Sequence, residues 1–118
     1  MPPEADLLRL RHMLDAAEDA SGFSAGRRRQ DLDQDRMLVL SLVKCIEIIG
    51  EAASRVSAAT QEEIPSLPWA DIIGMRNRLI HAYYDIDHDR VWDTILTDLP
   101  ELIDSLRLYL GAHTDPET

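Results

Sequence analysis

The sequence predicts an all-α protein, an up-and-down bundle of four helices, or five if the last one is broken. Its apolar residues recur at spacings of three and four, the period of one helix face, and no segment sustains the alternation of a strand. At 118 residues the chain is long enough for one core, so a single domain over residues 1–118 is expected. Repeats and low-complexity segments are absent from the sequence, which fits a bundle with short connections.

Apolar runs mark the first two helices. One helix carries Leu7, Leu10, Leu14 and Ala17 and closes near "SGFSAG", where glycine and serine favour a turn. A longer central helix is expected from about residue 31 to residue 58. Its core seam follows alternating spacings of four and three, through Leu38, Leu42, Cys45, Ile49, Ala52 and Val56.

A third helix should follow "PSLPW", because Pro68 suits the first turn of a helix. Its apolar pattern continues through Ile80, and it should carry the stretch "GMRNRLIHAYYDID" at residues 74–87. Gly74 lies inside this helix, where it costs roughly 0.5–1 kcal/mol relative to alanine. We therefore expect a close approach at Gly74, either by a neighbouring helix or by a second protomer.

A fourth helix should follow "DIDHD", with Asp87 or Asp89 as its cap. Apolar residues continue its core face from Val91 to Leu110. Pro100 cannot donate a backbone hydrogen bond, so a kink or break is expected near Leu99.

The charge of the chain limits its partners. Twelve basic residues against 22 acidic ones give a net charge of -10, which repels phosphate over most of the surface and excludes general coating of nucleic acid. A local basic site remains open, and arginines cluster at residues 26–29 and at Arg76 with Arg78. No signal peptide and no run of roughly 20 apolar residues is present, so we expect a soluble, cytoplasmic protein without a membrane contact.

The stretch at residues 74–87 concentrates the polar chemistry. On a continuous helix Asn77, His81 and Tyr84 would form one stripe, and Arg76 and Tyr83 would lie on the neighbouring stripe. An arginine, an amide and a histidine suit phosphoryl chemistry without a metal, through charge stabilisation, positioning and proton transfer. Arg76 and His81 would be about 140° apart on that helix, so they converge only if the arginine reaches around or a second chain completes the pocket.

A carboxylate pair offers a different chemistry. Glu47 and Glu51 are four residues apart on the helix face opposite the Leu38 and Leu42 seam, where they could serve acid-base or metal chemistry. No histidine stands nearby at ligand spacing, which favours a solvated or interface-facing pair. We therefore expect no metal site and no cofactor.

The segment "RNRLIHAY", Arg76 to Tyr83, resembles the signature of the HepT toxins: arginine, four residues, histidine, one residue, tyrosine. HepT toxins are a branch of the HEPN superfamily of helical ribonucleases. The resemblance extends to "IIGEAA" at residues 48–53, "PWADIIGMRN" at 68–77 and "VWDTILTDLPEL" at 91–102, in the family's order and approximate spacing.

This resemblance implies the toxin of a toxin–antitoxin pair, a metal-independent endoribonuclease that dimerises so that two motifs line one cleft. It implies that His81 is the general acid or base, that Arg76 steadies the developing charge and that Asn77 positions the phosphate or His81. It also implies a partner, a minimal nucleotidyltransferase antitoxin of the MntA type, which would transfer AMP to Tyr83.

Two other readings remain open on the sequence. The chain could be a helical dimer that only binds a partner protein, with Arg76 and His81 making structural hydrogen bonds at the interface. It could also be a regulator that binds a nucleotide through the same two residues without turnover.

Overall fold

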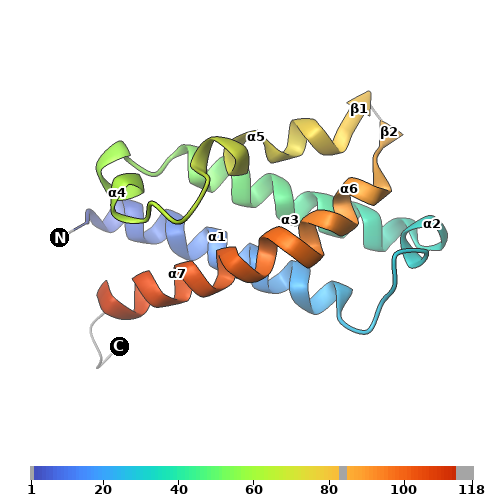
Figure 1. Ribbon diagram of the computed structural model, residues 1–118, viewed down its shortest axis with the longest axis horizontal. Coiled ribbons are helices and arrows are strands. Elements are labelled where there is room, and N and C mark those ends of the chain that lie inside the picture. The colour runs from blue at the N-terminus through green and yellow to red at the C-terminus, as the bar shows by residue number, and fades with distance from the viewer. Residues whose placement is uncertain (1, 83–84, 114–118) are drawn as a thin grey trace.

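Four long helical stretches run up and down the molecule around one apolar core (Figure 1). The computed structural model describes residues 2–82 and 85–113, and within them the all-α prediction is confirmed. The first three stretches are α1 (Glu4–Ser24), α3 (Arg36–Ser54) and α5 (Trp69–Leu79). The fourth is continuous through α6 (His88–Asp93), the π-helical turn η1 (Thr94–Asp98) and α7 (Leu99–His113).

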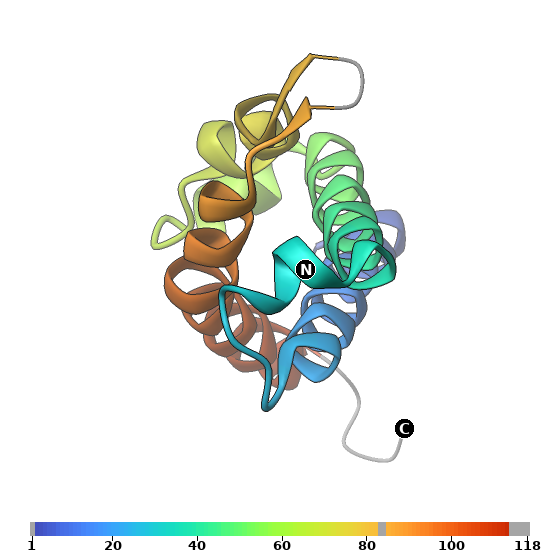
Figure 2. The same ribbon diagram turned by 90° about the vertical axis from the view of Figure 1, so that its right-hand side faces the viewer.

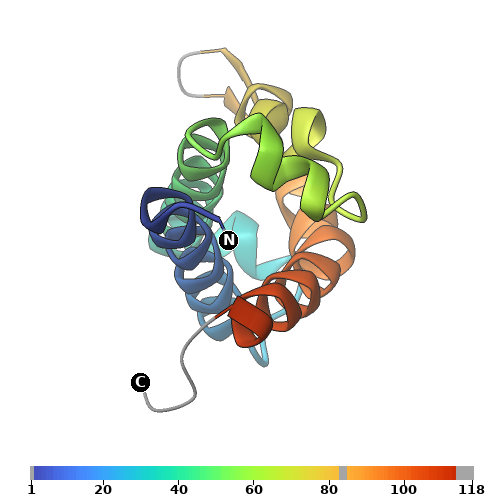
Figure 3. The same cartoon turned by 90° about the vertical axis from the view of Figure 1, so that its left-hand side faces the viewer.

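Packing between these helices follows the order of the chain. α1 lies against α3 and α7, and α3 also lies against α5, so that α3 stands between α1 and α5. The end-on view shows this succession around the bundle (Figure 3). Every residue of the predicted central seam is buried, as are three of the four predicted core residues of α1, and Leu7 packs against the core at its edge. None of the described helices is long and apolar enough to cross a membrane.

The predicted central helix over residues 31–58 is wrong in its extent, because two helix caps divide it. Asp35 has an extended backbone and its side chain accepts a hydrogen bond from the Leu38 amide, so α3 begins only after the short helix α2 (Asp31–Gln34). At the other end Arg55 leaves the helix, and Ser57 caps another short helix, α4 (Ala58–Glu63). Neither short helix was predicted, since one or two turns carry too little apolar periodicity.

The predicted third helix is correct in its position but too long. α5 ends at Leu79, and Ile80 is extended, with φ of -120° and ψ of 109°. The chain then forms a small antiparallel ladder of β1 (Ile80–Ala82) and β2 (Asp85–Ile86), in which Ile80 faces Ile86. Both isoleucines pack against the core, and this contact replaces further helix. The ladder projects beyond the helices (Figure 2).

The predicted break near Leu99 is a widened turn. In η1 the Leu99 amide donates to the carbonyl of Thr94, five residues back. Pro100 follows at once and has no amide to donate to Leu96, so the π-helical turn absorbs the missing hydrogen bond without interrupting the helix axis. The prediction for the start of this stretch is confirmed, because the Asp87 side chain caps α6 by accepting from the Arg90 amide.

The close helix approach within the chain lies at Gly50 and not at Gly74. A Cβ on Gly50 would stand 3.3 Å from the carbonyl oxygens of Ile72 and Ile73, so glycine lets α3 and α5 pack backbone to backbone. A Cβ on Gly74 would meet no atom within 4 Å among the described residues. The prediction that a neighbouring helix of the same chain approaches Gly74 is therefore wrong, and the second protomer remains the other possibility.

Candidate functional site

Arg76 and Asn77 both project from the last turns of α5, on its exposed side. The Nε of Arg76 donates to Oε1 of Glu47 at 2.7 Å, and the arginine side chain remains about half exposed, at 52%. Glu47 stands on α3, so this ion pair ties the motif helix to the central helix. The second oxygen of Glu47 lies 3.9 Å from Nζ of Lys44. Glu47 is thus a structural partner of Arg76. The sequence predicted that Glu47 and Glu51 would form a solvated or interface-facing pair, and it did not predict this contact.

His81 lies in β1 and not on the motif helix. The structure describes His81 by its backbone alone, while Tyr83 and Tyr84 lie outside the described residues. The predicted helical stripe through Asn77 and His81 is therefore wrong, because α5 ends at Leu79. The parts of the two stripes that concern Tyr83 and Tyr84 fall outside the described residues. The angle of about 140° between Arg76 and His81 no longer applies, since an extended segment redirects the chain after the helix.

Arg76 opens onto a groove between three helices, which we name the α1–α3–α5 groove. Its hollow measures about 450 Å³. Its walls are Arg9 and His12 of α1, Lys44, Glu47, Ile48, Glu51 and Ala52 of α3, and Arg76 of α5. Three cationic side chains face two carboxylates here, and one of these, Glu51, already pairs with Arg55 outside the groove at 2.8 Å. The groove therefore carries positive charge in a strongly acidic chain.

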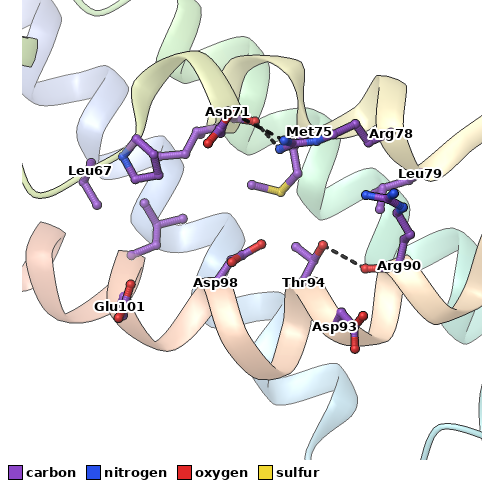
Figure 4. Close-up of a pocket in the computed structure, with 13 residues that line it drawn as sticks. Leu67, Asp71, Met75, Arg78, Leu79, Arg90, Asp93, Thr94, Asp98 and Glu101 are labelled. Carbon is purple, nitrogen blue, oxygen red and sulfur yellow. Dashed lines mark hydrogen bonds and ion pairs between the residues drawn. The ribbon is translucent and has the colours of Figure 1, made fainter.

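The other arginine of the motif faces a different hollow. Arg78 bends back along α5, where its Nη2 donates to the Asp71 carbonyl at 2.7 Å (Figure 4). It lines an α5–α7 cleft of about 290 Å³, whose charged walls hold two arginines and four carboxylates: Arg78, Arg90, Asp71, Asp93, Asp98 and Glu101. Desolvation raises the pKa of Asp98 above its usual value, although Arg78 opposes that shift. This cleft is acidic, so a phosphate should avoid it.

Two site residues were missed on the sequence. Neither Arg9 nor His12 was assigned a role on the sequence, yet both are half-buried in the groove that Arg76 lines. Their spacing of three residues places them on one face of α1, and this spacing was the feature of the sequence that could have indicated a shared site. Their nearness to Arg76 depends on how α1 packs on α3, which no local pattern reveals.

Among residues 2–82 and 85–113 no group of three or more histidine, cysteine, aspartate or glutamate side chains is arranged to hold a metal ion. The candidate site brings together Arg76 and Asn77 at the end of α5 and the cationic groove beside Arg76, and the backbone of His81 follows in β1.

An antiparallel helical bundle with an arginine–histidine motif at the end of its third long helix defines a HEPN-like fold. A family model described as "Ribonuclease HepT-like" matches residues 13–108. The chain belongs to this HepT-like ribonuclease family.

Individual relatives agree with the family model. A candidate RNase of Caldanaerobacter subterraneus is 36% identical over 93 residues, which cover 79% of this chain and 83% of the relative. A candidate RNase of Methanocaldococcus jannaschii is 30% identical and covers 76% of this chain and 83% of the relative. A protein of Thermococcus cleftensis named as a candidate ribonuclease HepT is 33% identical, covering 62% of this chain and 66% of the relative. No solved structure matches the chain.

Proposed function

We propose that this chain is the toxin of a HepT and MntA type toxin–antitoxin pair and acts as a metal-independent endoribonuclease. One observation carries the proposal: in a chain of the HepT-like ribonuclease family, the motif arginine Arg76 stands half exposed at a cationic groove. The rest of the surface is acidic on average, so this groove offers RNA a place where its phosphates meet positive charge.

The proposed reaction is an internal transesterification of RNA. The 2'-hydroxyl loses its proton to a base and attacks the adjacent phosphorus, and the bond from phosphorus to the 5'-oxygen breaks. The leaving oxygen takes up a proton, so the products end in a 2',3'-cyclic phosphate and a 5'-hydroxyl. His81 supplies one of these proton transfers, Arg76 stabilises the negative charge that develops on the phosphate, and Asn77 orients the phosphate or His81.

Incubation of the purified protein with RNA in the presence of a chelator tests the proposal. Cleavage that persists without divalent ions is the expected result. Intact RNA at high protein concentration would contradict the proposal and favour a helical module that only binds a partner. Binding of ATP or AMP in calorimetry, without any cleavage of RNA, would instead favour a nucleotide-binding regulator.

The proposed active form is a homodimer with α5 near the two-fold axis. Gly74 has open space beside it in one protomer, and its neighbour Ile73 is 40% exposed although it is apolar. A second copy of α5 would cover Ile73, and Gly74 would let the two backbones come close.

Gly74→Leu should therefore weaken the dimer and, with it, RNA cleavage. The wild type should sediment as a dimer at micromolar concentration, and the variant should shift toward monomer by roughly tenfold in dissociation constant. Helicity should stay unchanged, because a Cβ at residue 74 meets no atom of its own protomer within 4 Å among the described residues, and leucine favours a helix more than glycine does. A wild-type monomer in the same experiment would rule out this arrangement.

Control by the antitoxin is proposed to act on Tyr83. Tyr83 follows His81 by two residues, so an AMP group on its hydroxyl would bring a negative phosphodiester and an adenosine into the vicinity of the motif. The added charge would compete with RNA phosphate for the cationic side chains and block the substrate without unfolding the bundle.

Coexpression with an MntA-like nucleotidyltransferase should therefore add one or more AMP masses to the chain, on Tyr83, and remove RNA cleavage. Intact mass and peptide mapping provide the measurement. Tyr83→Phe should stay unmodified and active in the same cells. A fully neutralised toxin with an unmodified Tyr83 would show that the antitoxin works by binding alone.

A further inference from the structure

The face of the chain around Arg76 has cationic groups that the motif does not contain. Arg9 and His12 reach the α1–α3–α5 groove from the first helix, far from the motif in the sequence. Both are half-buried, so their side chains are held against the groove instead of extending freely into water. Charged side chains placed in this way lose less conformational freedom when they bind a ligand.

The charges of the groove are unevenly compensated. Glu47 faces both Arg76, at 2.7 Å, and Lys44, at 3.9 Å, and so partly neutralises these two cations. Arg9 has no ion pair or hydrogen bond from its side chain to any residue in the described part of the chain. It is therefore the cation of the groove whose charge is available to an incoming anion.

The two hollows beside α5 have net charges of opposite sign, and this difference decides which of them can accept RNA phosphates. The α5–α7 cleft holds four carboxylates and two arginines, whereas the α1–α3–α5 groove holds three cations against two carboxylates. An RNA strand that places a phosphate at Arg76 must continue across one side of α5. The acidic cleft repels the neighbouring phosphates, so the strand should continue over α1.

We propose that Arg9, together with His12, forms a phosphate subsite for the RNA strand next to the cleaved bond. This inference rests on the proposed ribonuclease function and extends it to a residue outside the motif. Arg9 binds the substrate and does not take part in the chemical step, because the proton transfers are assigned to the motif. His12 adds an imidazole N–H that can donate to a phosphate oxygen.

Binding of a short, fluorescent, fully 2'-O-methylated oligonucleotide tests the subsite, because this probe has no free 2'-hydroxyl and is not cleaved. Arg9→Ala should weaken binding roughly tenfold. The slope of log affinity against log salt, measured between roughly 50 and 200 mM, should become shallower by about 0.7, the contribution of one phosphate contact on a single strand. Arg9→Lys should restore most of both values, since it keeps the charge.

Arg11→Ala is the matched control. Arg11 is also on α1 but is exposed, and it does not line the groove. The control should bind like the wild type, whereas equal losses for Arg9→Ala and Arg11→Ala would overturn the subsite in favour of general surface charge. With cleavable RNA, Arg9→Ala should raise KM and leave kcat nearly unchanged.

The outcomes separate this inference from the proposed function. Cleavage by the wild type, together with unchanged binding and KM in Arg9→Ala, would overturn the subsite and leave the ribonuclease intact. Binding that depends on Arg9, without cleavage of RNA by the wild type, would support the subsite and contradict the ribonuclease. A wild type that neither binds the probe nor cleaves RNA would overturn both. Loss of antitoxin binding in Arg9→Ala, with RNA binding unchanged, would assign the groove to the partner protein and overturn the subsite.

Discussion

His81→Ala should lower RNA cleavage by roughly 10²- to 10⁴-fold, the usual contribution of a positioned general acid or base. It should also relieve growth inhibition when the chain is expressed. Thermal stability and dimer mass should stay close to those of the wild type, because His81 lies in a short strand whose ladder uses backbone groups that alanine retains. Initial cleavage rates of the two proteins, measured at equal dimer concentration, decide the matter.

His113→Ala provides a control with the same loss of an imidazole. His113 ends α7 at the opposite end of the bundle from the ladder, where it stacks on Tyr109 (Figure 1). Its removal should leave cleavage unchanged. The assignment of His81 would fail if His81→Ala cleaved RNA normally or lost its folded state.

Asp6→Ala should destabilise the fold by about 3 kcal/mol, the scale expected when a buried charged acceptor is lost and its donors remain without a partner. Asp6 is 4% exposed in the first turn of α1. It accepts hydrogen bonds from the Ser57 amide at 3.1 Å, from the Ser57 hydroxyl at 2.5 Å and from the Thr60 hydroxyl at 2.6 Å. The carboxylate thus fastens α1 to the start of α4.

Urea unfolding followed by circular dichroism measures this loss. Glu4→Ala is the matched control, because Glu4 is an exposed carboxylate in the same turn, and it should cost little. A loss below about 0.5 kcal/mol for Asp6→Ala, within the range of ordinary surface substitutions, would contradict the role of Asp6.

The same carboxylate gives stability a dependence on pH. Burial by itself would raise the pKa of Asp6, but the hydrogen bonds from Ser57 and Thr60 outweigh burial and hold the pKa below its usual value of 3.8. The stabilisation is therefore complete above pH 3.8 and is lost as the pH falls through the lower pKa of the folded state. The difference in stability between wild type and Asp6→Ala should shrink in that acidic range.

The sequence predicted the core well because burial on long helices follows a simple period. Leu42, Ile46 and Ile49 are completely buried on α3, although Ile46 was not part of the predicted seam. Helix boundaries were harder to predict. No glycine or proline marks the end of α5, and the helix stops because Ile80 and Ile86 pack on the core as paired strand residues, which is a tertiary effect.

The candidate site was predictable only in part for the same reason. The motif residues Arg76, Asn77 and His81 share one short segment, so their chemistry could be read locally. The groups around Arg76 come from other helices: Glu47 of α3 pairs with it, and Arg9 of α1 lines the same groove. Their meeting depends on the packing of three helices, including the close approach at Gly50, and these contacts are absent from local sequence patterns.

The ends of the cleaved RNA test the central claim most directly. Mass spectrometry of fragments produced in the presence of a chelator should find 2',3'-cyclic phosphate on the upstream fragment and a free 5'-hydroxyl on the downstream one. A single 2'-deoxy substitution at the cleaved nucleotide should stop cleavage at that bond. Fragments that end in a 3'-hydroxyl and a 5'-phosphate, or cleavage that requires a divalent ion, would contradict attack by the 2'-hydroxyl through Arg76 and His81.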